Sequence, residues 1–242
     1  MSEFDANHFP KASSHLPIRE LGPDLFLAPG SIHMMPLMTF SRNMVIVRHS
    51  DELTLVNPIR LSPEGEAELA ALGTVRHAIR LGVFHGLDDA YTVARFGAEF
   101  WCQAGSDEYP EPTPDHELTE DRPLPIPDSQ LFVFRETTKP ECALLLQRGN
   151  GILLTCDGLQ HYGDYERQSA LAKLLMPLIG FPKSTVLGPF WLKFLTRKGG
   201  SLKPDFERLL QLPFDALISA HGTPLMQGAH DAVRQAIART FN

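Results

Sequence analysis

The chain is poor in cysteine, and its basic residues are fewer than its acidic ones. Three cysteines occur in 242 residues, at Cys102, Cys142 and Cys156. They are odd in number and form no C-x-x-C pair, which argues against a disulfide framework and a cysteine zinc site. So little cysteine favours a reducing compartment, and we predict a cytoplasmic location. With 22 Lys and Arg against 29 Asp and Glu, the net charge is −7, so the chain lacks the basic surface typical of nucleic-acid binders.

Long apolar runs and nucleotide-binding glycine motifs are also missing. The most apolar stretch, residues 171–181, is interrupted by Lys173 and Pro177, whereas a membrane-spanning helix needs about 20 apolar residues. We therefore expect no membrane and no nucleic acid among the partners, and we leave the oligomeric state open. No GxGxxG follows a predicted strand and no GxxxxGKS/T occurs, which argues against dinucleotide-binding and P-loop folds.

What the chain does contain is an ordinary globular composition, with 43% hydrophobic residues, and enough length to bury one large core. Residues 1–20 hold scattered polar residues without periodicity, so we predict a loose N-terminal arm there and a single domain over residues 21–242. Short β-prone runs then alternate with helical patterns. Strands are expected at residues 25–28, 44–48, 53–56, 75–81, 131–134, 142–146, 152–156 and 216–220, and helices at residues 63–72, 88–96, 165–179, 204–212 and 229–241.

Residues 106–128 differ from the rest in composition. They hold six prolines and eight carboxylates against one arginine, a pattern typical of an extended surface loop. The loop is either a connector or a lid. It separates two successive sets of strands, each carrying helices, and this layout fits one α/β domain with layered sheets.

Four polar residues follow predicted strands at points where the chain leaves a sheet. His85, Asp157 and His221 each come after a strand, and Asp89 lies just beyond His85. The ends of strands are where α/β proteins place functional groups. Two imidazoles and two carboxylates suit a divalent ion such as zinc, iron or manganese. Because an unpaired buried carboxylate is costly, Asp157 needs a partner, which is a metal ion, a cluster of backbone amides or an arginine.

Three of the segments that contain these residues also resemble motifs of a known family. Residues 84–90 read Phe-His-Gly-Leu-Asp-Asp-Ala, residues 152–157 end on Cys-Asp, and residues 219–222 read Ser-Ala-His-Gly. In this order they resemble ligand-bearing segments of the metallo-β-lactamase fold superfamily: the HxHxDH motif, the strand that ends on Gly-Asp, and the late S-x-H-G. The resemblance covers roughly residues 24–241. It implies an α/β (α+β) domain folded as a four-layer αββα sandwich.

The resemblance is incomplete at the metal site. Leu87, Ala90 and Thr138 stand where the superfamily has three of its seven usual ligands, so the resemblance implies one ion instead of two. Residues 42–48, together with the Asn57-Pro58 pair, are similar to a branch of the superfamily that has no established substrate. In that branch an Asn-Pro or Ser-Pro pair replaces the usual Asp-Thr-Gly.

We predict from this resemblance one divalent ion, with zinc as the first choice, bound by Asp89, Asp157 and His221. His85 serves either as a fourth ligand or as a general base, and Asp89 is the other candidate to orient or deprotonate the attacking water. A shift of one residue in the motif would bring Asp88 into the site and leave Asp89 as a helix cap. A chain without any metal is the remaining alternative.

These assignments point to hydrolysis of a small molecule. We expect a metal-dependent hydrolase whose metal-activated water attacks an ester, thioester, lactone or phosphoester. The first alternative is a non-catalytic pseudoenzyme that binds a ligand or partner on the same fold, because three ligands are lost. The second is a redox enzyme with one bound iron. The fold alone does not choose between them.

Overall fold

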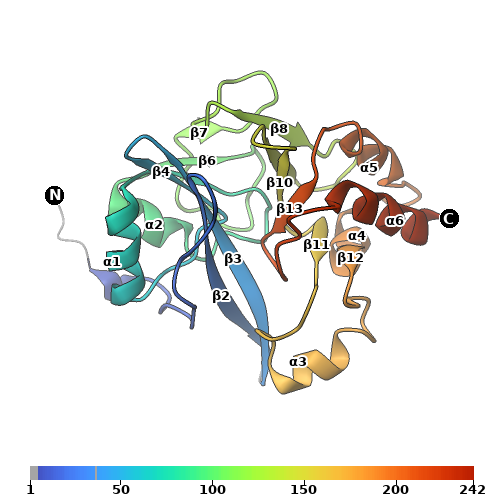
Figure 1. The fold of residues 1–242 in the computed structure, drawn as a ribbon, viewed down its shortest axis with the longest axis horizontal. Coiled ribbons are helices and arrows are strands. Elements are labelled where there is room, and N and C mark those ends of the chain that lie inside the picture. Colours follow the sequence, from blue (N-terminus) through green and yellow to red (C-terminus); the bar gives the residue numbers. More distant parts are fainter. Residues whose placement is uncertain (1–4, 36) are drawn as a thin grey trace.

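Strands that are apolar on both faces form the centre of the structure, a computed structural model that describes residues 5–35 and 37–242 (Figure 1). The first sheet has seven strands in chain order: β1 (Arg19–Gly22), β2 (Leu25–Met35), β3 (Met38–His49), β4 (Glu52–Val56), β5 (Thr74–Ile79), β6 (Glu99–Cys102) and β7 (His116–Glu117). The second has four, in the order β13 (Ala216–Ser219), β10 (Ile152–Thr155), β9 (Cys142–Leu146) and β8 (Ser129–Val133). A separate pair joins β11 (Leu159–His161) to β12 (Thr185–Leu187).

Both faces of each sheet are covered. Successive residues of a strand point to opposite faces, and in β2 Leu25 and Leu27 pack between the two sheets while Phe26 and Ala28 pack on the outer side. The strand β9 alternates in the same way. Burial on both faces explains why these strands read as nearly continuous apolar runs in the sequence.

Helices form the two outer layers. Next to the first sheet lie α1 (Pro63–Leu72), which packs through Leu69, and α2 (Asp89–Phe96). Against the second sheet pack α4 (Pro189–Leu195), α5 (Lys203–Leu209) and α6 (Ala229–Phe241). The predicted αββα sandwich is therefore confirmed. None of the helices in the described ranges is both long and apolar enough to cross a bilayer.

The predicted helix over residues 165–179 is shorter in the structure. Here α3 (Ala170–Leu175) begins after Ser169, whose side chain accepts a hydrogen bond from the amide of Ala172. An N-cap of this kind starts a helix at a point that apolar periodicity alone does not mark. The flanking apolar residues Tyr165 and Phe181 pack into a small cluster of their own instead of extending the helix.

The β2–β3 hairpin is longer than predicted. The strand expected at residues 25–28 continues to Met35, because β2 pairs with β3 along its whole length. Figure 1 shows the far end of this hairpin next to α3. The predicted loop over residues 106–128 is confirmed except for the two residues of β7, which pair with β6.

The predicted N-terminal arm is tied to the domain over much of its length. Residues 1–4 lie outside the described residues, and the 3₁₀ turn η1 (Ala6–His8) follows them. His15 then accepts a hydrogen bond from the amide of Ser62 at 2.8 Å, and β1 adds a strand from Arg19 onward. The residues after η1 therefore contact the first sheet and the start of α1.

Candidate metal centre

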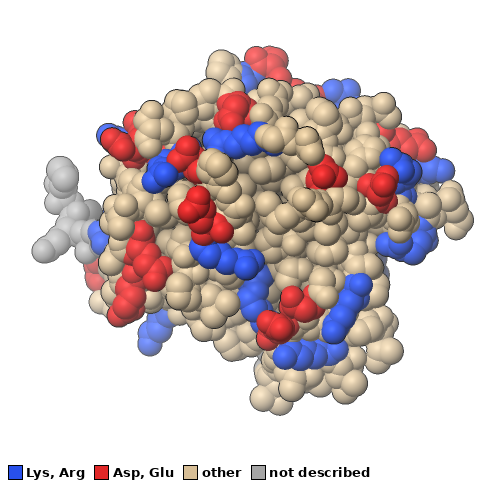
Figure 2. Space-filling model, in the orientation of Figure 1, with Lys and Arg blue, Asp and Glu red and all other residues tan. Residues whose placement is uncertain are grey.

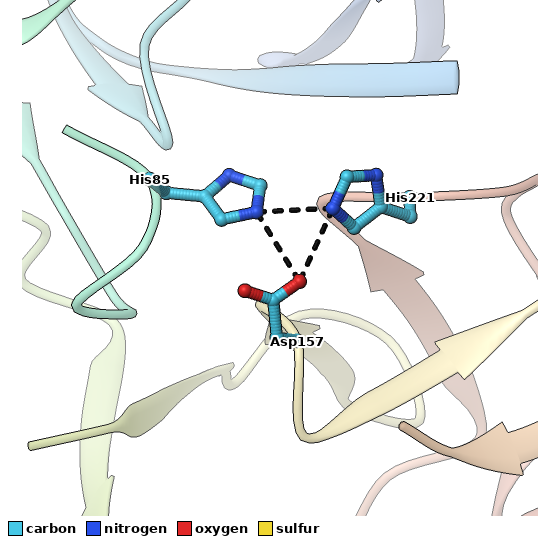
Figure 3. A group of neighbouring side chains, drawn as sticks. All are labelled: His85, Asp157 and His221. Carbon is cyan, nitrogen blue, oxygen red and sulfur yellow. Dashed lines mark hydrogen bonds and ion pairs between the residues drawn. The ribbon is translucent and has the colours of Figure 1, made fainter. Parts of the chain in front are cut away.

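Three of the four predicted ligands meet at one point between the sheets (Figure 3). The Nε2 atom of His85 lies 3.0 Å from Nε2 of His221 and 3.3 Å from Oδ1 of Asp157. The Nε2 atom of His221 lies 3.1 Å from the same Oδ1. Two imidazole nitrogens and one carboxylate oxygen thus form a small triangle whose edges are nearly equal.

The topology explains why residues so far apart in the sequence converge. The strands β10 and β13 are parallel neighbours, with Thr155 opposite Ser219. Asp157 and His221 each lie two residues beyond these positions, so they emerge at the same edge of the second sheet. His85 comes from the first sheet, in the turn after β5. The amide of Cys142 on β9 donates to the carbonyl of Leu81 at 2.9 Å and brings the two sheets together there.

The backbone of β3 fixes the orientation of His221. The Nδ1 atom of His221 lies 2.6 Å from the carbonyl oxygen of Ser41. A carbonyl only accepts hydrogen bonds, so Nδ1 donates, and the lone pair of Nε2 points into the triangle. Ser41 is itself held, because its amide donates to Gln168 at 2.9 Å and its hydroxyl oxygen accepts from the Gln168 side chain at 2.7 Å.

The charges in the triangle favour cation binding. Burial by itself would raise the pKa of Asp157, but the charges and hydrogen bonds of His85 and His221 outweigh it and hold that pKa below its ordinary value. Burial lowers the pKa of His85, against the opposing effect of Asp157. Asp157 therefore offers an anionic oxygen, and the lowered pKa of His85 makes a proton on its imidazole easier for a metal ion to displace; carboxylate and unprotonated imidazole are the forms that bind metals.

The spacing of the three atoms also fits a small cation. Zinc bonds to nitrogen and oxygen are about 2.0–2.2 Å long, which places tetrahedral ligand atoms about 3.3–3.5 Å apart. The observed separations are 3.0, 3.3 and 3.1 Å. Two nitrogen lone pairs this close to each other and to a carboxylate repel unless a proton or a metal ion lies between them. The donor set thus fits one divalent ion.

Asp89 is not part of this group. Its Oδ2 atom lies 3.2 Å from Nη1 of Arg80, and the two side chains are 0% and 2% exposed. The alternative residue, Asp88, pairs with Arg42 at 2.5 Å and is also buried. Neither Asp88 nor Asp89 is among the three grouped residues, so the prediction that Asp89 is one of the metal ligands is corrected. An arginine was one of the partners expected for Asp157. In the structure Arg42 pairs with Asp88 and Arg80 pairs with Asp89.

Sequence reasoning missed two asparagines that join strand ends behind the site. Asn57 donates to the carbonyl of Thr155 at 3.3 Å and accepts from the amide of Leu81 at 3.1 Å. Asn43 donates to the carbonyl of Ser219 at 2.8 Å. Both lie in the segments similar to the superfamily branch without a known substrate, and that similarity is the signal from which they could have been found.

A buried carboxyl group supports the turn after Asp157. Glu141 is 1% exposed, and its Oε1 accepts a hydrogen bond from the amide of Gly158 at 2.8 Å. Burial, together with the nearby charge of Asp157, raises the pKa of Glu141 well above its ordinary value. The position of Glu141 directly before β9 does not indicate this contact in the sequence, because Gly158 lies in the turn between β10 and β11.

The buried position of Asp89 gives a first prediction, on the pH dependence of stability. Burial raises the pKa of Asp89 to about 7, although Arg80 opposes the shift. Between pH 4 and 7 the folded chain therefore binds a proton that the unfolded chain does not. This contribution to stability is present at low pH and is lost as the pH rises through 7. Relative to wild type, Asp89→Asn should gain about 2–3 kcal/mol between pH 5 and 7.5.

Denaturant unfolding of both proteins across this range measures the difference directly. A difference between Asp89→Asn and wild type that is the same at pH 5 and pH 7.5 would mean that Asp89 stays ionised beside Arg80 throughout.

Comparison with known proteins finds a similar fold but no matching sequence family. No family model matches the chain, and no curated protein matches it. Among solved structures, the DIM-1 metallo-β-lactamase exposed to ceftazidime is similar over 95% of this chain and 99% of its own, with a TM-score of 0.66 and 10% identity. The chain has the metallo-β-lactamase fold. The resemblance inferred from its motifs is therefore confirmed at the level of the fold.

Two further metallo-β-lactamases share this fold. FIM-1 from Pseudomonas aeruginosa, in a mono-zinc form, is 14% identical, with a TM-score of 0.61 over 95% of this chain and 97% of that chain. A metallo-β-lactamase from Erythrobacter litoralis is 12% identical, with a TM-score of 0.55 over 94% and 96%. At such low identity the likeness concerns the arrangement of the backbone, so the chemistry of the site has to be argued from this chain's own residues.

Proposed function

We propose that this chain is a metal-dependent hydrolase whose single divalent ion is bound by His85, Asp157 and His221. The convergence of their three donor atoms within 3.3 Å of one another carries the proposal. Two imidazoles and one carboxylate form a ligand set that suits zinc, and three protein ligands leave a coordination position open for substrate or water. Iron and manganese accept similar donors.

The surroundings support one ion instead of two. Leu87 and Ala90 have no ligand atoms in their side chains, and the Asp89 carboxylate lies 3.2 Å from the Arg80 guanidinium. A second divalent ion at Asp89 would therefore be repelled by a fixed positive charge in a buried setting. The mono-zinc form of FIM-1 supports the idea that a single zinc ion is compatible with this fold.

The side chains of the triangle have distinct tasks in the proposed reaction. A bound divalent ion supplies Lewis acidity and lowers the pKa of water, which gives a nucleophile at neutral pH. Asp157 contributes the negative charge that attracts the ion. The carbonyl of Ser41 accepts from Nδ1 of His221 and thereby orients Nε2 of the same ring toward the other two donors. Asp157 is 16% and His221 14% exposed, so these two side chains are in contact with solvent.

His85 and Asp89 also differ in what they can do for catalysis. Nε2 of His85 faces the other two donors, which favours the ligand role over that of general base. Asp89 is fully buried beside Arg80, which removes it from contact with the water and the substrate. We propose that it acts as a structural partner of Arg80.

We propose a small ester, thioester, lactone or phosphoester as the substrate, because each presents a carbonyl or phosphoryl group that a Lewis acid polarises. All three cysteines are free and buried, a state that suits a reducing compartment, and we propose a cytoplasmic location.

A hydrolysis screen of the purified protein tests the proposal. The wild-type chain, loaded with zinc, is assayed against one chromogenic ester, thioester, lactone and phosphoester, then treated with a chelator and reloaded. We expect turnover of at least one class that is lost on chelation and restored by zinc. Zinc binding without any turnover would favour the non-catalytic ligand-binding alternative. Visible absorption from copurified iron would favour the redox alternative.

A further inference from the structure

One segment of the chain has a charge opposite to that of the whole molecule. Residues 168–202 hold five basic side chains and no acidic one, in a protein of net charge −7. The five are Lys173, Lys183, Lys193, Arg197 and Lys198, and all are exposed. The acidic excess therefore lies entirely in the rest of the chain, and the segment that contains α3 and α4 is locally cationic.

The same segment exposes large apolar side chains. Nine such residues are exposed in the described part of the chain, and five of them, Leu171, Leu174, Leu178, Phe190 and Phe194, lie between residues 168 and 202. Leu174 is 68% and Leu178 78% exposed. Leu171, Leu174 and Leu178 are spaced by three and four residues, which places them on one side of α3 and the turn that continues it.

The tip of the β2–β3 hairpin extends this apolar surface. Leu37 is 82% exposed, and its carbonyl accepts a hydrogen bond from the hydroxyl of Ser169 at 2.9 Å. The hairpin tip and the start of α3 therefore lie side by side at the lower edge of Figure 1. Figure 2 shows that the lobe at this edge carries neither basic nor acidic side chains at its end, while charged residues gather just above it.

Two acidic residues lie close to Lys173 of α3. Asp164 and Glu166 line a shallow hollow of about 410 Å³ together with Tyr165, Lys173 and Lys183. In this hollow the two carboxylates lie beside two of the five basic residues, and Lys193, Arg197 and Lys198, on and after α4, carry the remaining positive charge of the segment. An exposed apolar lobe bordered by lysines is the pattern of a protein surface that lies on a lipid bilayer. A neutral apolar partner would leave the basic residues without a role.

We propose that Leu37 and residues 168–202 form a docking face for the surface of an anionic lipid bilayer. The leucines enter the boundary between head groups and acyl chains, and the basic residues contact anionic head groups. The expectation of no membrane partner rested on the absence of a spanning run, and a surface contact requires none. The face adjoins the metal centre, because Gln168 at its edge holds Ser41, whose carbonyl orients His221.

Cosedimentation with vesicles tests the docking face without any assay of hydrolysis. The full chain is mixed with vesicles of phosphatidylcholine alone and of phosphatidylcholine with 30% phosphatidylglycerol, at 50 and 500 mM NaCl. We expect binding to the anionic vesicles that falls at high salt. The variant Leu174→Ser/Leu178→Ser should bind about tenfold or more weakly, because two exposed leucines are removed without any loss of core packing. Lys193→Glu/Lys198→Glu should weaken binding to anionic vesicles as well.

The control is Leu16→Ser, which changes an exposed leucine outside the docking face (52% exposed) and should bind like wild type. Circular dichroism and thermal unfolding verify that each variant is folded. The proposal is overturned if wild type binds neither vesicle at 50 mM NaCl. It is also overturned if the leucine variant binds as wild type does, or if sedimentation velocity shows that the leucines hold two copies together while vesicles stay unbound.

Discussion

Replacing His221 with alanine is expected to lower the affinity for zinc by more than about 100-fold. Loss of a group that only supports a ligand costs about 10–100-fold in affinity, and His221 contributes a donor atom of its own, 3.1 Å from Asp157 and 3.0 Å from His85. Turnover at a fixed low zinc concentration should fall by at least the same factor, because the metal-free chain lacks the Lewis acid. Competition with a chromophoric zinc chelator measures the affinity.

The control for this variant is His161→Ala. His161 lies on β11, where its backbone pairs with Gly222 next to His221, and its Nδ1 is 2.9 Å from the hydroxyl of Thr185. It is not among the three grouped residues, so its removal should leave zinc affinity within about twofold of wild type. Equal losses in the two variants would show that zinc binds elsewhere, or that both act by unsettling the fold.

The second large effect is expected at the buried ion pair behind the site. Arg42 and Asp88 are 4% and 7% exposed and 2.5 Å apart, and Arg42 also donates to the carbonyl of His85 at 3.3 Å. Arg42→Met would leave Asp88 as a buried, unpaired charge, so we expect a loss of about 3–5 kcal/mol in the free energy of unfolding. Urea denaturation measures it.

Two further variants test whether the unpaired charge of Asp88 causes this loss of stability. Arg48→Met removes an arginine from an exposed pair with Asp24, whose side chains are 34% and 51% exposed, and should cost less than about 1 kcal/mol. Adding Asp88→Leu to Arg42→Met removes the unpaired charge and should recover part of the loss. If Arg42→Met is no more costly than Arg48→Met, the buried pair does not stabilise the fold as described.

The fold could be predicted from the sequence because its layers leave a local trace. Strands covered on both faces must be apolar at successive positions, and this makes β9 and β10 recognisable without any partner. The exceptions depend on hydrogen bonds, which the pattern of apolar residues does not record. The length of β2 is set by its pairing with β3, and the start of α3 by the side chain of Ser169. Hydrophobic periodicity shows neither of these.

The site could be predicted only in part, for a related reason. His85, Asp157 and His221 follow strands whose ends the topology brings together, so their position in the sequence already indicates a shared location. Asp89 has an equally suggestive position. Its neighbour in space is Arg80, the residue directly after β5, and no sequence spacing reveals that pair. Tertiary packing decides which of the two carboxylates meets an arginine and which meets two histidines.

The ratio of zinc to protein tests the central claim most directly. The purified chain is saturated with zinc, freed of excess metal by gel filtration and analysed by plasma mass spectrometry, with Asp157→Asn treated in parallel. We predict one zinc per chain in wild type and close to none in the variant. A wild-type ratio of zero would contradict the metal centre. A ratio of two would contradict the single site. A ratio of one that persists in Asp157→Asn would place the ion away from His85, Asp157 and His221.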